Sequence, residues 1–181
     1  MAVDETLRRE LLDMARDDQS ARQALAGSGG FDDAEGWQTL RIVDEPHADR
    51  LWEILDDYER WPAVSLVGED GAHAAWLLAQ HAVTDPGLQR RCLDLLEVAV
   101  ALDDAPPIHL AYLVDRVRVA DGRDQSYGTQ FVGAGDGTTI EPWPIEDADG
   151  VDGRRERLGL PALALHTRLM QEHYRQARSG L

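Results

Sequence analysis

The stretch G-E-D-G-A-H-A-A-W-L-L-A-Q-H-A-V, residues 68–83, has a helical pattern and almost no charged outer face. At roughly 100° per residue, one side of such a helix is filled by Ala75, Leu78, Ala79 and Ala82. The polar residues fall within an arc of about 120° on the other side: Glu69, Asp70, His73, Gln80 and His81. A helix that is apolar nearly all round belongs in a core, where polar groups need partners. The sequence therefore predicts a buried central helix, and the polar stripe across it marks a candidate site.

Length and composition favour one globular domain over residues 1–181. The chain is 43% hydrophobic and 29% charged, which is typical of a protein with a real core. Its formal net charge is −16, and a field of that sign repels phosphate backbones and anionic membrane surfaces. We therefore expect neither nucleic acid nor a membrane among its partners.

Several features predict a cytoplasmic, bacterial protein. The amino terminus lacks the apolar core of a signal peptide, and no window approaches the roughly 20 apolar residues that span a bilayer. The single cysteine, Cys92, cannot form an internal disulfide and fits a reducing compartment. All basic residues are Arg, which is associated with a high-GC coding bias.

The remaining chain predicts mostly helices. Residues 1–36 form an amphipathic helix followed by a Gly-rich acidic connector, and residues 37–43 are either a short strand or an extended lead. Hydrophobic spacings of three and four predict helices over residues 44–58, 86–99 and 109–119, a short one near 152–159 and a last one from 161. Residues 125–145 look like two short strands around a Gly-rich turn. The predicted fold is mainly α: a single-domain bundle of about six to seven helices with one small β-hairpin.

Three polar motifs give this chain a family resemblance. They are Q-H-A-x-x-D at residues 80–85, D-R-V at 115–117 and Q-x-Y-G-T-Q at 125–130. Together with the run from Pro144 to Pro161, they resemble an uncharacterised family of small bacterial proteins, a domain of unknown function. The likeness covers a core motif region of roughly residues 61–165. It implies no activity, substrate or cofactor.

His81 is the sharpest catalytic candidate. An imidazole can act as a general base near neutral pH or bind a metal, although a satisfied core histidine is the alternative. Asp85 can orient His81 from the end of the same helix, or it can cap the next helix. Gln80 and Gln89 are candidate substrate-binding amides, and Gln89 is equally well explained as a solvated helix residue.

A second group of candidates lies further along the chain. Asp115 is a catalytic candidate, and Arg116 and Arg118 can clamp a carboxylate or another polar ligand. Internal ion pairing explains them as well. Substrate-binding candidates in the predicted hairpin are Gln125, Tyr127 and Gln130; along a strand, Gln125 and Tyr127 would share one face and Gln130 would lie on the other. A purely structural hairpin is the alternative.

Metal binding and several familiar chemistries have little support. Glu69 and His73 are spaced to share a metal ion, but Leu77 interrupts the pattern and no thiolates help. We assign no metal ligands, and no cofactor is required, although a divalent metal stays open. The chain has no G-x-S-x-G elbow, no phosphate-binding Gly-Lys-Ser/Thr loop and no C-x-x-C pair.

Two functions remain after these exclusions. The first is a small cytoplasmic enzyme that performs hydrolytic or acid–base chemistry on a small polar molecule or peptide, with His81 in a pocket on the central helix. That pocket would also hold residues of the second group. The alternative is an acidic binding module, of an immunity or regulatory type, that recognises a basic protein through its charge of −16 without catalysis.

Overall fold

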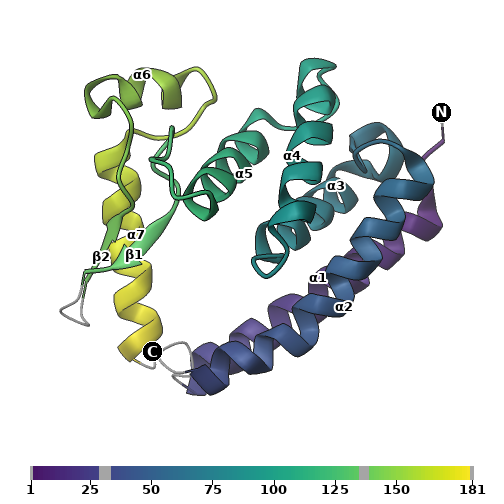
Figure 1. Ribbon diagram of the computed structural model, residues 1–181, viewed down its shortest axis with the longest axis horizontal. Helices are drawn as coiled ribbons and strands as arrows, with labels where there is room; N and C mark the ends of the chain where they lie inside the picture. Colours follow the sequence, from purple (N-terminus) through teal and green to yellow (C-terminus); the bar gives the residue numbers. More distant parts are fainter. Residues whose placement is uncertain (1, 29–33, 135–138, 180–181) are drawn as a thin grey trace. The chain divides into compact units, whose positions relative to one another are not determined.

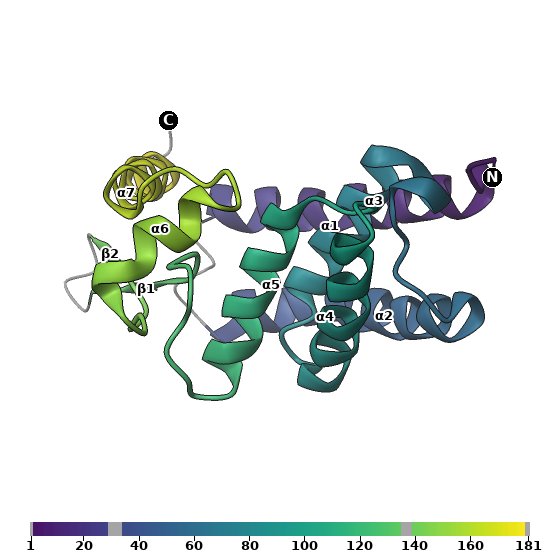
Figure 2. The same ribbon diagram turned by 90° about the horizontal axis from the view of Figure 1, so that it is seen from above.

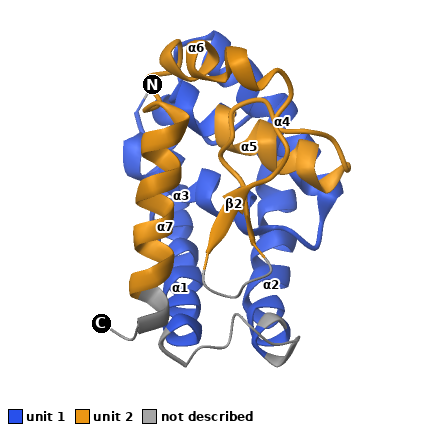
Figure 3. Cartoon of the chain, turned by 90° about the vertical axis from the view of Figure 1, so that its left-hand side faces the viewer, with its two compact units in different colours: residues 1–110 blue, residues 111–181 orange. Residues whose placement is uncertain are grey.

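The computed structural model describes residues 2–28, 34–134 and 139–179. Within these ranges the chain forms seven α-helices and one two-stranded β-hairpin, which confirms the mainly α fold with a small hairpin (Figure 1). It divides into two compact units, residues 1–110 and residues 111–181, and each is described here separately (Figure 3). The single-domain organisation stays a prediction. No helix in the described ranges is both long enough and apolar enough to cross a bilayer.

The first unit is built on three long helices and a fourth that packs on them. They are α1 (Glu5–Ser28), α2 (Ala34–Tyr58), α3 (Val64–His81) and α4 (Pro86–Ala101). Helices α1 and α2 run antiparallel, and both contact α3 (Figure 2). Helix α4 contacts α2 and α3. The core between them is apolar, and its fully buried members include Leu11, Leu51, Ile54, Ala75 and Leu88.

Helix α3 is the predicted central helix, and it begins at Val64 rather than at Gly68. Gly68 lies inside the helix with φ +74°, a left-handed conformation that favours glycine, and it kinks the helix there. Beyond the kink one face is buried as the pattern predicted, with Ala75, Leu78 and Ala79 among its members. Pattern and packing agree because the apolar residues of this stretch recur at the helical period.

The prediction of a strand or extended lead at residues 37–43 was wrong. Helix α2 is continuous from Ala34 through Pro46 to Tyr58, so the predicted connector is helical from Ala34; its residues 29–33 lie outside the described ranges. Leu40, Asp44, Ala48 and Leu51 follow one another at helical spacing and are all buried. Burial of this continuous face offsets the backbone hydrogen bond that Pro46 removes.

Helix α5 (Pro107–Ala120) starts in the first unit and continues into the second. The second unit then contains β1 (Phe131–Gly133), β2 (Ile140–Pro142), a 3-10 turn η2 (Ala148–Gly150), α6 (Val151–Glu156) and α7 (Leu163–Ser179). The strands pair antiparallel, with Val132 opposite Glu141. Helix α7 contacts β2 and α6. The hairpin confirms the predicted β element, although its strands are only three residues long.

Apart from an isolated β-bridge between Gln125 and Ile145, residues 125–130 form a loop rather than a strand, so the predicted alternation of side chains does not occur. The backbone N–H groups of Ser126, Tyr127 and Thr129 bind the Asp115 carboxylate instead of a neighbouring strand. Gly128 takes φ +68° between them. The carboxylate thus replaces the hydrogen bonds that a β-ladder would supply.

Candidate functional site

A cluster of four ionisable side chains joins the three long helices of the first unit. Asp18 and Arg22 come from successive turns of α1, Asp44 from α2, and His81 is the last residue of α3. We call these four residues the His81 cluster. Asp18 is 1% exposed and Asp44 6% exposed, whereas the His81 side chain keeps 22% of its surface exposed. The carboxylates are therefore inside, and the imidazole lies at the edge.

The His81 ring faces both Asp18 and Arg22 with its Nδ1 edge. Its Nδ1 lies 2.9 and 2.8 Å from the two carboxylate oxygens of Asp18. Arg22 Nε–H also points at Nδ1, from 2.9 Å, so Nδ1 donates to Asp18 in the tautomer that is protonated there and accepts from Arg22 in the other. In the Nδ1-protonated neutral ring, which the two contacts with the Asp18 carboxylate favour, Nε2 has a free lone pair, and it makes no hydrogen bond to any described residue. This arrangement holds the imidazole ready to accept a proton at Nε2.

Arg22 links both carboxylates of the cluster. Its Nε donates to Asp18 Oδ1 at 3.1 Å, and its Nη2 donates to Asp44 Oδ1 at 2.7 Å. Burial raises the pKa of Asp18, but the hydrogen bond and charge of His81, with the charge of Arg22, outweigh it and leave that pKa lowered. Burial keeps the pKa of Asp44 raised despite its pairing with Arg22. Asp18 is thus the more firmly ionised carboxylate, and it lies beside the imidazole.

The other predicted residues near His81 serve the ends of helices. Asp85 accepts from the Leu88 backbone N–H at 2.9 Å as the N-cap of α4, and from the Trp52 indole at 2.7 Å. Its capping interpretation is the one that the hydrogen bonds support. Gln89 is 1% exposed, so it is not a solvated residue, and its amide donates to the Ala79 carbonyl at the end of α3. Gln89 thus ties α4 to the end of α3 that carries His81, and Asp85 ties the start of α4 to Trp52 on α2.

Gln80 differs from these helix-end residues. It is 4% exposed, and its side-chain Nε2 is buried without a hydrogen-bond partner in the described part of the chain. An unpaired buried amide costs about 1–3 kcal/mol. Gln80, the neighbour of His81 in the chain, is therefore a buried polar group that the helix packing alone does not explain.

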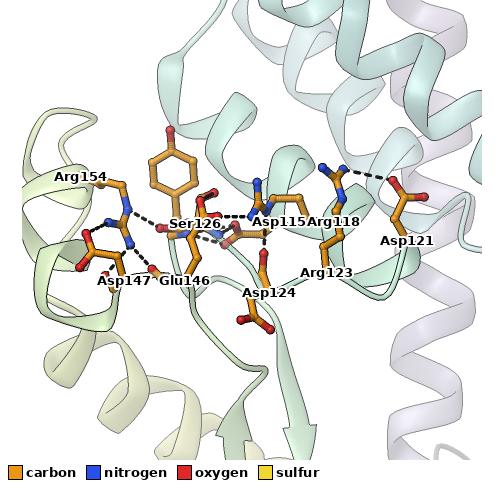
Figure 4. Close-up of polar contacts among 10 residues, drawn as sticks. Asp115, Arg118, Asp121, Arg123, Asp124, Ser126, Glu146, Asp147 and Arg154 are labelled. Carbon is orange, nitrogen blue, oxygen red and sulfur yellow. Dashed lines mark hydrogen bonds and ion pairs between the residues drawn. The ribbon is translucent and has the colours of Figure 1, made fainter.

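Asp115 organises the second unit rather than facing a ligand. It is fully buried on α5, and its carboxylate accepts from three backbone N–H groups and from the Thr129 hydroxyl at 2.9 Å. Figure 4 shows this carboxylate with Ser126 among the surrounding charged residues. Four donors occupy its oxygens, so no lone pair is left over for catalysis. The hydrogen bonds give Asp115 the role of a loop anchor.

The glutamines of the second unit also bind the backbone. Gln125 is fully buried, and its Nε2 donates to the Gln130 and Trp143 carbonyls at 3.0 and 2.8 Å. Gln130 donates its backbone N–H to Gln125 Oε1 and its side-chain amide to the Thr129 hydroxyl. Tyr127 is half-buried and contributes its backbone to the same loop. These contacts support the structural alternative for the Q-x-Y-G-T-Q motif.

The arginines of the second unit hold this loop against the following segment. Arg118 donates to the Asp124 carbonyl at 2.6 Å and pairs with Glu146, whose carboxylate also accepts from the Ser126 hydroxyl at 2.5 Å. These hydrogen bonds, that from Ser126 first, hold the pKa of Glu146 below its usual range. Arg116, the neighbour of Asp115, is half-buried. The expected clamp is thus an internal ion pair at Arg118, the alternative considered from the sequence.

The predicted residues therefore fall into two groups. His81, Gln80, Asp85 and Gln89 belong to the first unit, whereas Asp115, Arg116, Arg118, Gln125, Tyr127 and Gln130 belong to the second. A shared pocket stays a prediction. Sequence reasoning missed three members of the His81 cluster: Asp18, Arg22 and Asp44. A signal existed, because Asp18 and Arg22 interrupt the buried stripe that runs from Leu11 to Leu25 at helical spacing.

The fold and the His81 cluster define a mainly helical protein with a carboxylate–imidazole pair between its long helices. Within that class, the chain belongs to a family of unknown function, DUF6624, whose model matches residues 5–177. This confirms the resemblance to an uncharacterised family and extends it to α1 and α2, which carry three of the four cluster residues. No curated protein and no solved structure matches the chain.

Proposed function

We propose that this protein is a small bacterial enzyme of the cytoplasm that performs acid–base chemistry, such as hydrolysis, on a small polar substrate. The reacting atom is Nε2 of His81. One observation carries the proposal: a partly exposed imidazole is held at 2.8 Å by a carboxylate that is itself 1% exposed. A buried carboxylate that orients an exposed imidazole is the arrangement that general-base catalysis needs.

Each residue of the His81 cluster has a distinct part in this chemistry. His81 takes a proton at Nε2 from water or from a substrate hydroxyl, and returns it to the leaving group. Asp18 holds Nδ1–H and stabilises the imidazolium that forms. Arg22 and Asp44 do not react; they fix Asp18 in place. When His81 is protonated, the positive charges of Arg22 and His81 balance the negative charges of Asp18 and Asp44. The cluster is therefore neutral while His81 holds the transferred proton.

The cluster is also costly as a purely structural device. Buried ion pairs contribute little net stability, because desolvation offsets most of their attraction. Apolar side chains at these positions would join the three helices at least as well. The retention of a buried network with a free imidazole nitrogen supports a role beyond packing, and the unpaired amide of Gln80 beside it points the same way.

The first test measures proton release by the purified protein with panels of small esters, amides and phosphoesters. We expect turnover of one class, a loss of roughly 100-fold or more in His81→Gln and a smaller loss in Asp18→Asn. His173→Gln is the matched control, since His173 is an exposed histidine on α7. Unchanged turnover in a folded His81→Gln variant, or no turnover across the panels, counts against the proposal.

A second test needs no substrate. Diethyl pyrocarbonate acylates an accessible, unprotonated imidazole nitrogen, and peptide mass spectrometry locates the product. We expect His81 to react at a rate similar to that of exposed His173. We also expect Asp18→Asn to change the rate at His81 and leave that at His173 unaltered. A His81 that stays unmodified while His173 reacts would show that Nε2 is closed off, and would reject the proposed role.

A further inference from the structure

A second polar site lies at the other end of α3, apart from the His81 cluster. A cavity of about 500 Å³ opens between the start of α3 and the segment that connects α4 to α5. Its volume is within the range of small-molecule sites. His73 lines it, and His81 follows two turns later, about 12 Å along the helix axis. We propose that this cavity binds a small aliphatic amine through its ammonium group.

The charge of the cavity favours a cation. Three carboxylates line it, from Glu69, Asp103 and Asp104, and no arginine does. Asp104 is already engaged, because it accepts from the backbone N–H and the hydroxyl of Ser65 at 2.7 and 2.5 Å. Glu69 and Asp103 make no ion pair with any described residue. Two carboxylates are thus available to an ammonium group.

Two histidines, His73 and His109, also line this cavity. His73 Nδ1 lies 3.3 Å from His109 Nε2. His109 is 7% exposed and stacks on Trp76, with ring centroids 4.5 Å apart. Its Nδ1 is buried without a partner among the described residues. Burial lowers the pKa of His109 to about 4, so the ring is neutral near pH 7 and does not repel a cation.

The rest of the cavity wall is apolar and favours a ligand with an aliphatic chain. Val64, Ala105 and Pro106 line the cavity beside the acidic groups. An aliphatic chain that carries an ammonium group matches this division, since the chain covers the apolar wall while the charge meets the carboxylates. A divalent cation fits less well, because no group of three or more His, Cys, Asp or Glu side chains in the described ranges is arranged to hold a metal.

The test uses isothermal titration calorimetry with 1,5-diaminopentane at low ionic strength, and 1,5-pentanediol as its uncharged analogue. We expect saturable binding of the diamine with a dissociation constant of about 1 mM or below, and none of the diol. Glu69→Gln/Asp103→Asn should weaken diamine binding about tenfold, because it removes both carboxylates that are available to the ammonium group. Asp94→Asn/Glu97→Gln removes two exposed carboxylates of α4 that do not line the cavity, and should leave binding unchanged.

Three outcomes would overturn this assignment. Equal weakening in the two double variants would mean that the diamine senses only the overall negative charge. Equal binding of the diol would show that the cavity does not recognise the ammonium group. Saturation by zinc chloride without any binding of the diamine would make the cavity a metal site. None of these outcomes bears on His81, whose own tests are separate.

Discussion

The two polar centres of this protein are built from similar residues but are satisfied in different ways. In the second unit, Asp115 is fully buried and all of its partners are backbone N–H groups or the Thr129 hydroxyl. In the first unit, Asp18 is just as deeply buried, but its partners are the side chains of Gln19, Arg22 and His81. Asp115 thus holds a backbone loop in place, whereas Asp18 orients the imidazole ring of His81.

This difference separates scaffold from candidate function. A carboxylate that satisfies backbone donors replaces the hydrogen bonds of regular structure, and its removal orphans those donors. A carboxylate that binds only side chains can be removed with its partners at little net cost. The contrast teaches that burial and charge alone do not identify a reactive site; the identity of the partners and a free reactive atom do.

The largest expected effect is at Asp115. Asp115→Ala leaves buried backbone donors without partners, and we expect a loss of roughly 3–5 kcal/mol in the free energy of unfolding. Urea denaturation measures the loss, and NMR hydrogen exchange should show faster exchange of the Ser126 and Thr129 amides. Asp124→Asn, at an exposed residue of the same loop, is the control and should change stability by less than about 0.5 kcal/mol. A loss below about 1 kcal/mol in Asp115→Ala would contradict the anchoring role.

Gly128 tests how firmly the anchored loop is packed. A Cβ built there would lie 2.6 Å from Leu163 Cδ1 and 2.9 Å from Ile145 Cδ1, and φ is +68°. We expect Gly128→Ala to cost about 2–4 kcal/mol in urea denaturation, from strain and overpacking together. Gly122→Ala has a similar φ of +70° but open space, so its smaller loss isolates the backbone term. Equal losses in the two variants would mean that the contacts with Leu163 and Ile145 carry no cost.

His81 should be much less important for stability than Asp115. After His81→Ala, Asp18 keeps its hydrogen bonds from Arg22 and Gln19, so we expect a loss of about 1 kcal/mol. In a chain of this size that lowers the melting temperature by a few degrees, which differential scanning calorimetry measures. A fall of more than about 8 °C would move His81 from a reactive site to the scaffold.

The smallest effect distinguishes the two carboxylates of the His81 cluster by pH. Because folding lowers the pKa of Asp18, its ionised carboxylate stabilises the fold at any pH above the pKa that Asp18 has in the unfolded chain. This contribution is lost as the pH falls through the pKa of Asp18 in the folded protein. The raised pKa of Asp44 has the opposite sign: its ionised form costs stability, and protonation relieves that cost as the pH falls.

Stability curves from about pH 6 to pH 3 test this difference. Asp18→Asn should make the free energy of unfolding fall less steeply below about pH 4, and Asp44→Asn should make it fall more steeply. Urea denaturation at each pH provides the measurement, with the exposed Asp94→Asn as the control. Parallel shifts in the two variants would show that the cluster titrates as one unit.

The sequence by itself determined the helical architecture and the central helix. Apolar residues at spacings of three and four in residues 68–83 and 86–99 are enough to assign those helices, because the pattern is local and matches the helical period. It also predicted the Asp85–Pro86 start of α4, since capping depends on residues adjacent in the chain. The short hairpin was predicted from turn residues for the same reason.

Only the tertiary structure decided which polar residues are partners. Asp18 and His81 are 63 positions apart, and their contact depends on how α1 packs on α3. Burial of one face likewise allows α2 to continue past Pro46. In residues 125–130, backbone N–H groups bind the Asp115 carboxylate rather than a neighbouring strand. Hydrophobic spacing in the sequence reveals the period of a single helix or strand. The partner of a buried charge is set by neighbouring elements, because a desolvated group must be satisfied by whatever the fold brings beside it.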